Sequence, residues 1–217
     1  MSDFATRRRM MVDTQVRPSD VTEFPIIDAM LTVPREAFVP RDRIEAAYVS
    51  EHIDLGAGRV LLDPRLFAKM LDALDINNDD LVLDLGVGYG YSAAVIARIA
   101  EAVVAVEDDA ERLEEAQALI AEHHADNVVL HSAALTEGAA EHGPYDVIMI
   151  EGGVEVLPEP LTAQLKEGGR IAAIMIEGAL GTVRIGRKID GVMNWRDAFN
   201  GTAPVIPGFE KKTEFAF

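Results

Sequence analysis

An acidic residue followed by three alternating glycines is the stretch of this sequence best suited to holding a ligand. Asp84 follows the apolar run 81–83, and Gly86, Gly88 and Gly90 come after it at every second position. A short apolar run indicates a buried parallel strand, and glycines let the backbone approach a ligand without Cβ clashes. The residues after the glycines predict a helix, whose first N–H groups would face the same ligand. Strand, glycine loop and helix together are typical of a nucleotide-binding βαβ unit.

The position of the acid indicates which nucleotide would bind. The fingerprint of dinucleotide sites is G-x-G-x-x-G, whereas here Asp84 precedes the first glycine and Tyr91 stands where a third Rossmann glycine would fall. A carboxylate at the strand end is a poor neighbour for a pyrophosphate, but it suits a cationic group. The amino group and sulfonium of S-adenosylmethionine carry that charge. The spacing therefore favours S-adenosylmethionine, and an ordinary glycine turn is the alternative.

A second acid follows the next predicted strand. The apolar run 103–106 ends at Glu107, and Asp108 comes directly after it. A carboxylate at this point of a nucleotide-binding fold accepts hydrogen bonds from ribose hydroxyls. We therefore expect Glu107 to hold the ribose, and we include Asp108 in the predicted cofactor site.

Composition excludes several classes of site and partner. The chain has 217 residues, a net charge of −17, five histidines and no cysteine. The missing cysteines exclude disulfides, thiolate metal sites and a cysteine nucleophile, and no H-x-x-x-H pair predicts a metal site. The negative surface disfavours nucleic acid, whose binding draws on Lys and Arg. No run approaches the roughly 20 apolar residues of a membrane span, and the N-terminus lacks a signal-peptide core, so we expect a cytoplasmic protein that does not bind membranes.

The predicted elements fall into two regions. Residues 1–75 read as a helical lid, with helices over 3–16, 21–31, 41–47 and 64–74 and a loop at 56–58. Residues 76–217 alternate strand and helix, which predicts an α/β, mostly parallel, doubly wound sheet. Its predicted strands are 81–85, 102–106, 128–130, 145–150 and 170–176, followed by an antiparallel hairpin of 182–188 and 192–199. Its predicted helices are 91–100, 109–123 and 158–165.

Several segments resemble the protein-L-isoaspartate O-methyltransferases. They include Val33-Pro34-Arg35-Glu36-x-Phe38-Val39-Pro40, the acid and glycine loop 84–91, and Gln164-Leu165-Lys166-x-Gly168-Gly169. The resemblance covers nearly the whole chain. It implies a Rossmann-like methyltransferase fold, S-adenosylmethionine as cofactor, and methylation of isoaspartyl carboxylates in proteins under repair.

The sequence departs from this family pattern at two places. Where the family has Gly-Gln-Thr-Ile-Ser-Gln-Pro, with its serine at the reaction centre, this chain has Gly58-Arg59-Val60-Leu61-Leu62-Asp63-Pro64. Where the family has Gly-Asp-Gly, with the aspartate on the adenine amine, this chain has Ala133-Ala134-Leu135. The resemblance thus places Val60, Leu61, Leu62 and Asp63 on the substrate side, and Ala133 and Ala134 beside adenine.

The acceptor decides which further residues the reaction needs. A carboxylate is already ionised at pH 7, so its methylation needs alignment with the methyl group and no general base. An amine or hydroxyl acceptor would need a base, and Asp63 and Glu151 are the candidates. Asp63 could instead cap the helix that starts at Pro64, and Glu151 could be an exposed loop acid.

Three hypotheses follow for the chain as a whole. The first is methylation of isoaspartyl carboxylates in a protein or peptide. The second is transfer to another small acceptor, and the third is a non-catalytic module that binds cofactor or protein. The apolar residues at 60–62 predict weak activity on isoaspartyl peptides, which a Val60→Thr, Leu62→Ser double variant should raise.

Overall fold

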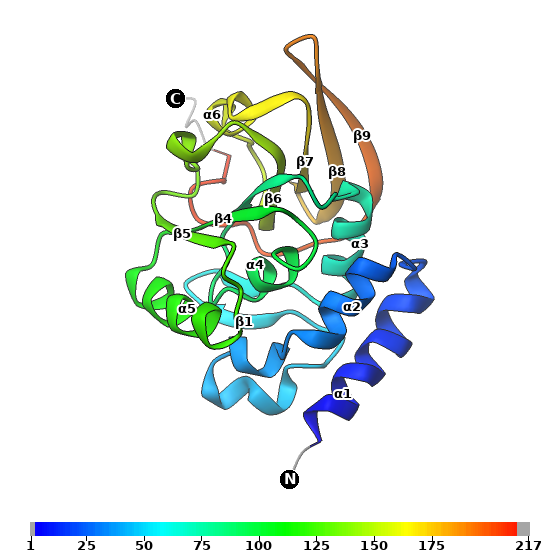
Figure 1. Cartoon of the computed structure of the whole chain (residues 1–217). Coiled ribbons are helices and arrows are strands. Elements are labelled where there is room, and N and C mark those ends of the chain that lie inside the picture. Colours follow the sequence, from blue (N-terminus) through cyan, green and yellow to red (C-terminus); the bar gives the residue numbers. More distant parts are fainter. Residues whose placement is uncertain (1–2, 212–217) are drawn as a thin grey trace, which may run out of the picture.

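A seven-stranded sheet forms the centre of this computed structural model, which describes residues 3–211 (Figure 1). The strand order is β5-β4-β3-β6-β7-β8-β9. The first five of these pair in parallel, and the last two pair antiparallel at one edge. The strands are β3 (Leu81–Leu85), β4 (Ala102–Glu107), β5 (Val128–Ser132), β6 (Tyr145–Val154), β7 (Leu165–Glu177), β8 (Leu180–Ile189) and β9 (Val192–Asn200). The predicted fold class is confirmed.

The order of the strands determines where a ligand can bind. From β3 the chain runs outward through β4 to β5, and it then returns to place β6 on the other side of β3. In open α/β sheets, ligands bind outside the carboxyl ends of the strands at such a reversal. Asp84, the glycine loop and Glu107 all lie at the carboxyl ends of β3 and β4.

Helices cover one face of the sheet, and a helix with the C-terminal segment covers the other. The first face packs against α2 (Phe24–Thr32), α3 (Pro64–Leu74), α4 (Tyr91–Ile96) and α5 (Ala110–Glu122). The second face packs against α6 (Glu159–Ala163) and residues 203–209. Successive side chains of a strand point to opposite faces of the sheet, so each face has its own apolar cluster. Val82 belongs to the cluster on the first face and Leu83 to the cluster on the second.

The first part of the chain is largely helical, as predicted. Helix α1 (Phe4–Met11) continues as a π-helical segment to Val16, and short 3-10 turns follow at Arg17–Ser19, Arg35–Phe38 and Arg41–Ala46. Helix α3 starts at Pro64 with Asp63 as its N-cap. Among residues 3–211, no helix is long and apolar enough to cross a membrane.

The first part also contains two short strands that were not predicted. The loop predicted at 56–58 is the turn of a small hairpin of β1 (Ile53–Gly56) and β2 (Arg59–Leu61), which is separate from the main sheet. Each strand is too short to show clear alternation, and its only partner is the other strand. The turn at 56–58 consists of three residues with positive φ, two of which are glycines.

Several predicted bounds also change. Strand β6 extends to Val154, so Glu151 lies inside a buried strand, and the reading of Glu151 as an exposed loop acid is wrong. Helix α4 ends at Ile96, four residues earlier than predicted. The β8–β9 hairpin is confirmed, and its turn at Asp190 and Gly191 has positive φ at both residues.

Candidate cofactor-binding site

The glycine loop connects β3 to α4 with its backbone turned toward Glu107. Gly86, Gly88 and Gly90 have φ values of +87°, +57° and +93°, which favour glycine. The Gly86 N–H donates to the carbonyl oxygen of Val106 at 2.9 Å, which ties the loop to β4. The Gly88 N–H donates to Oε2 of Glu107 at 2.8 Å. The predicted loop and the predicted ribose acid are therefore in direct contact.

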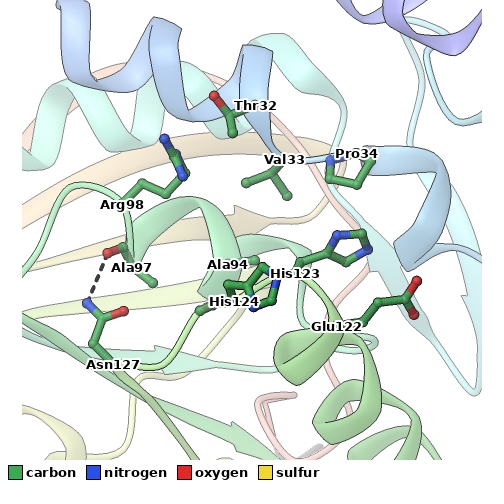
Figure 2. A pocket seen from close by; sticks show the side chains of 11 residues that line it. Thr32, Val33, Pro34, Ala94, Ala97, Arg98, Glu122, His123, His124 and Asn127 are labelled. Carbon is green, nitrogen blue, oxygen red and sulfur yellow. Dashed lines mark hydrogen bonds between the residues drawn. The ribbon is translucent and has the colours of Figure 1, made fainter.

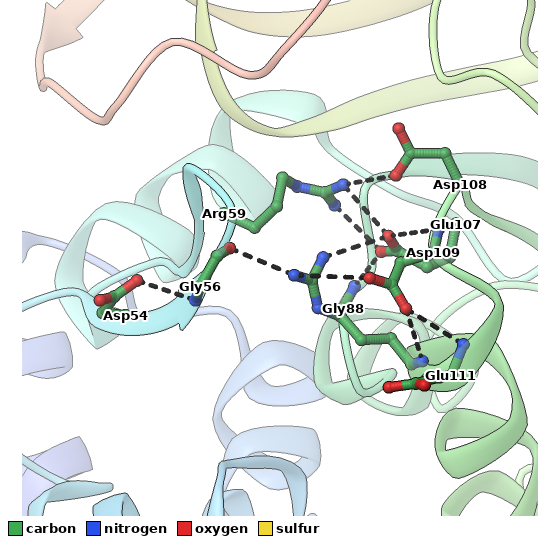
Figure 3. Close-up of polar contacts among 9 residues, drawn as sticks. Asp54, Gly56, Arg59, Gly88, Glu107, Asp108, Asp109 and Glu111 are labelled. Atoms are coloured by element: carbon green, nitrogen blue, oxygen red, sulfur yellow. Dashed lines mark hydrogen bonds and ion pairs between the residues drawn. The ribbon is translucent and has the colours of Figure 1, made fainter.

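Glu107 is fully buried and holds several hydrogen bonds. Figure 3 shows its carboxylate facing the guanidinium of Arg59, with Nη1 3.1 Å from Oε1 and Nη2 3.0 Å from Oε2. Nη1 of Arg112 lies 3.6 Å from Oε1. Burial raises the pKa of Glu107, although the charge of Arg59 opposes this shift. The carboxylate is thus held in place by two cations and the loop backbone.

Arg59 brings β2 into the site, a contact that the sequence did not predict. Its side chain is only 3% exposed, and Nη1 also contacts Oδ1 of Asp108 at 3.1 Å. A Cβ atom added to Gly86 would lie 2.6 Å from Nη2 of Arg59. The guanidinium therefore rests on the open side of the glycine loop, between that loop and Glu107.

Two further buried acids lie beside this cluster. Asp84 lies near the carboxyl end of β3 and Glu151 lies on the neighbouring strand β6, and both are buried. Neither oxygen of Asp84 has a hydrogen-bond partner among the described residues. Burial raises the pKa of Asp84 to about 7, against the charge of Arg59. Burial and then the charge of Asp84 raise the pKa of Glu151 well above its ordinary value. The pair therefore holds a proton near neutral pH.

Residues 60–63, on the predicted substrate side, are held by hydrogen bonds to Arg35, His52 and Leu66. Leu62 is fully buried, and its carbonyl oxygen accepts from Nη2 of Arg35 at 2.6 Å. Asp63 caps α3 by accepting from the Leu66 N–H at 3.0 Å. The Asp63 N–H donates to Nδ1 of His52 at 2.9 Å, so Nε2 of that histidine carries the proton donated to the Thr202 carbonyl. Val60 and Leu61 lie on β2.

Three other predicted site residues lie around the edge of this cluster. Tyr91 is buried with its ring against Phe38 and Phe67, at centroid distances of 6.0 and 5.6 Å, and below the guanidinium of Arg35. Ala133 and Ala134 follow β5, with Ala134 exposed. The next residue, Leu135, points back toward Gly86, with Cδ1 3.6 Å from the position of an added Cβ.

Two polar features lie outside this site. A cavity of about 410 Å³ lies between the helical lid, the end of α4 and the residues before β5, at the amino ends of the strands, and Figure 2 shows Arg98 and His123 on its wall. Separately, His131, Glu141 and His142 bring their ligand atoms within 4.8 Å of one another. Their positions in the sequence do not follow the H-x-x-x-H spacing, so that pattern did not reveal them. Oε1 of Glu141 lies 3.5 Å from Nδ1 of His131 and 3.4 Å from Nε2 of His142.

The sequence pattern indicated the acids and the glycines of the site but missed Arg59 and Arg112. Arg59 pairs with an acid 48 positions away. One signal was present, because Arg59 precedes three apolar residues in a chain of net charge −17. A cation in an apolar segment needs a buried partner, and Glu107 follows an equally apolar strand.

Comparisons with known proteins agree with this geometry. The family model for protein-L-isoaspartate(D-aspartate) O-methyltransferase matches residues 7–197. A protein-L-isoaspartate O-methyltransferase of Roseiflexus sp. (strain RS-1) is 36% identical over 169 residues, which are 78% of this chain and 77% of that relative.

Two solved structures are similar over almost the whole chain. A protein-L-isoaspartate O-methyltransferase has a TM-score of 0.81 at 25% identity, over 93% of this chain and 66% of that one. A Plasmodium falciparum protein described as a beta-aspartate methyltransferase, in complex with S-adenosyl-L-homocysteine, shares the fold with a TM-score of 0.79 at 16% identity, over 95% of this chain and 99% of that one. The family match and the identity of the bacterial relative show that this chain belongs to the protein-L-isoaspartate O-methyltransferase family, whose members are S-adenosylmethionine-dependent methyltransferases.

Proposed function

We propose that this protein transfers the methyl group of S-adenosylmethionine to the free carboxylate of isoaspartyl residues in proteins or peptides. One observation carries the proposal: the buried carboxylate of Glu107 lies at the carboxyl end of β4, where the Gly88 N–H fixes it beside the glycine loop. An acid at this point of the sheet suits the two ribose hydroxyls of a nucleoside. A role in protein repair belongs to the same proposal, since the family resemblance implies it, and so does the cytoplasmic location expected from the sequence.

The acids and the glycines of the site suit this cofactor in their chemistry. At Gly86 and Gly88, the space that a Cβ would fill is bordered by side-chain ends of Arg59, Leu55 and Leu135. Asp84 and Glu151 offer negative charge toward the cationic end of the cofactor. We assign the ribose to Glu107, with Asp108 beside it. The adenine then falls near Ala133 and Ala134, where this chain lacks the aspartate of the family pattern, and its amine meets a backbone carbonyl, a water or a different side chain.

The chemistry asks little of the protein beyond placement. When bound, the cofactor supplies an electrophilic methyl group on sulfur. An isoaspartyl carboxylate is already ionised at neutral pH and needs no base. Holding two reactants in line can supply roughly 7–11 kcal/mol of the barrier. The hydrogen bond from Arg35 to the Leu62 carbonyl supports this role, since it anchors the chain at Leu62 beside the substrate side.

The side chains at 60–62 are apolar, so we expect backbone groups there to supply the polar contacts to a substrate peptide. Leu62 is fully buried, and its carbonyl oxygen is already bonded to Arg35. Val60 is half-buried on β2 and is better placed to contact a substrate. A buried polar group without a partner costs about 1–3 kcal/mol, which is equivalent to roughly a tenfold loss of rate per 1.4 kcal/mol. We therefore expect slow turnover of isoaspartyl peptides.

Transfer of a labelled methyl group tests the proposal. The assay compares an isoaspartyl peptide with its twin of the same sequence containing ordinary aspartate, at saturating cofactor. Base-labile label on the isoaspartyl peptide alone would support it. The Glu107→Gln variant should lose most of this activity through weaker cofactor binding. Equal labelling of both peptides, or activity unchanged in Glu107→Gln, would refute it.

A further inference from the structure

The β1–β2 hairpin lies over the glycine loop and contacts it at two points. A Cβ atom added to Gly86 would meet Nη2 of Arg59 at 2.6 Å, and one added to Gly88 would meet Cδ1 of Leu55 at 2.6 Å. Leu55 lies at an irregularity in the pairing of β1 with β2, and such bulges redirect side chains. Both sides of the hairpin therefore reach the surface of the loop that its glycines leave open.

Arg59 saturates the acid to which we assigned the ribose. Its two terminal nitrogens pair with the two oxygens of Glu107, at 3.1 and 3.0 Å, in the parallel geometry of a fork-like ion pair. The Gly88 N–H and Arg112 contact the same carboxylate. Ribose hydroxyls would need the same oxygen lone pairs and the same side of Gly86. Arg59 and the ribose therefore cannot both occupy this place.

We propose that the β1–β2 hairpin is a latch that holds the cofactor site closed, with Arg59 as an internal competitor for the ribose of S-adenosylmethionine. This inference rests on the cofactor assignment made above. Cofactor binds only to the fraction of molecules in which Arg59 has left Glu107, and the apparent dissociation constant rises by the inverse of that fraction. Arg59 thus sets cofactor affinity without touching the reacting atoms.

The construction of the hairpin suits such a movement. Its two strands pair only with each other, so withdrawing them breaks no hydrogen bond of the main sheet. Its turn is exposed, and a side-chain hydrogen bond ties it to the cofactor domain, from Nη2 of Arg112 to the Gly56 carbonyl at 3.2 Å. On the other side, Nη1 of Arg59 contacts Asp108, which is half-exposed and can pair with Arg59 outside the site.

Calorimetric titration with S-adenosylhomocysteine tests the latch. Arg59→Gln removes the positive charge and the paired hydrogen bonds to Glu107, and it restores the glutamine of the family pattern. We expect this variant to bind at least tenfold more tightly than the parent. Arg17→Gln is the control, because it also removes one cation but lies on the surface, paired with Asp13, and leaves Arg59 over Gly86. The control should bind no more tightly than the parent.

Nitrogen-15 spectra of the arginine side chains give a second reading that does not depend on the stability of a variant. Nε of Arg59 is buried without a hydrogen-bond partner among the described residues, so its proton should exchange slowly in the free parent. Saturating S-adenosylhomocysteine should shift this signal and speed its exchange. The signal that disappears in Arg59→Gln belongs to Arg59, and Arg59→Lys provides the same assignment if Arg59→Gln does not fold.

The outcomes separate the latch from the cofactor assignment. Equal affinity of parent and Arg59→Gln, or an Arg59 signal unchanged at saturation, would overturn the latch and leave the assignment intact. Absence of binding to the parent and to every folded variant would overturn both. Tighter binding in Arg17→Gln to the same degree as in Arg59→Gln would also overturn the latch, because the loss of one positive charge would explain it.

Discussion

Nη2 of Arg35 lies 2.6 Å from the carbonyl oxygen of Leu62, and this hydrogen bond joins the helical lid to the segment beside the site. Nε of the same guanidinium donates to the Ala47 carbonyl at 2.7 Å, and its plane lies over the ring of Tyr91 at 4.9 Å. The side chain is fully buried. One arginine thus connects the lid, the substrate side and α4.

We predict that Arg35→Lys destabilises the fold, because an ammonium cannot reach both carbonyls in this planar arrangement. Hydrogen bonds to charged groups contribute about 1.5–3 kcal/mol each, so the free energy of unfolding should fall by at least that amount. Urea denaturation measures it. Arg17→Lys is the control, since Arg17 pairs with Asp13 on the surface and should change little. Equal effects of the two changes would contradict the role of Arg35.

The buried acids predict a specific pH dependence of stability. The pKa of Asp84 is 3.8 in the unfolded chain and about 7 when folded. Between these values the folded state holds a proton that the unfolded state has released, so stability falls as pH rises. The slope is at most about 1.4 kcal/mol per pH unit for each such proton.

Asp84→Asn should remove the part of this dependence that comes from Asp84, because an amide does not titrate. Denaturation of parent and variant from about pH 4 to pH 7 measures the difference in unfolding free energy. We expect the parent to lose stability relative to the variant as pH rises. The exposed acid change Asp79→Asn should leave the slope of the parent unaltered. A flat difference between parent and Asp84→Asn would show that the folded pKa of Asp84 is not raised.

Variants of Asp63 test whether its carboxylate serves as the N-cap of α3 or as a general base in catalysis. Its carboxylate accepts from the Leu66 N–H at the start of α3, so Asp63→Ala should cost about 1 kcal/mol of stability. Asp63→Asn keeps a cap and should cost little. If the acceptor is a carboxylate, methyl transfer by Asp63→Asn should match that of the parent at a temperature where both are folded. A large loss of activity in Asp63→Asn with unchanged stability would instead make Asp63 a base.

The apolar residues at 60–62 predict two separable effects. Leu62 is fully buried, so Leu62→Ser should cost about 2–5 kcal/mol, as for other large-to-small core changes. Val60 is half-buried, and Val60→Thr should be tolerated. We expect the double variant to gain activity on isoaspartyl peptides when assayed below its lowered melting temperature. A variant that is folded at the assay temperature and gains nothing would show that hydroxyls are not the missing contacts.

The parts of the site that the sequence revealed are those fixed by local geometry. A strand, a glycine turn with positive φ and an acid at the next strand end follow from residue types a few positions apart, so Asp84, Gly86, Gly88 and Glu107 could be predicted. The central strands could also be predicted, because buried parallel strands are continuous apolar runs.

The parts that the sequence hid depend on contacts between distant segments. The pairing of Arg59 with Glu107 spans 48 positions, and no local period marks it. The hairpin of β1 and β2 is too short for alternation to distinguish it from a loop. Glu151 was predicted at the end of its strand because an acid and two glycines usually end one, whereas here close packing of 203–206 against Gly152 and Gly153 continues β6 past it.

A crystal structure of the parent protein with S-adenosylhomocysteine tests the central claim most directly. We predict that both ribose hydroxyls bond to the carboxylate of Glu107 above the glycine loop, with the homocysteine end toward Asp84 and Glu151. The guanidinium of Arg59 should then lie outside that position, with the β1–β2 hairpin displaced. A nucleoside bound elsewhere, with the pair of Arg59 and Glu107 intact, would contradict the account.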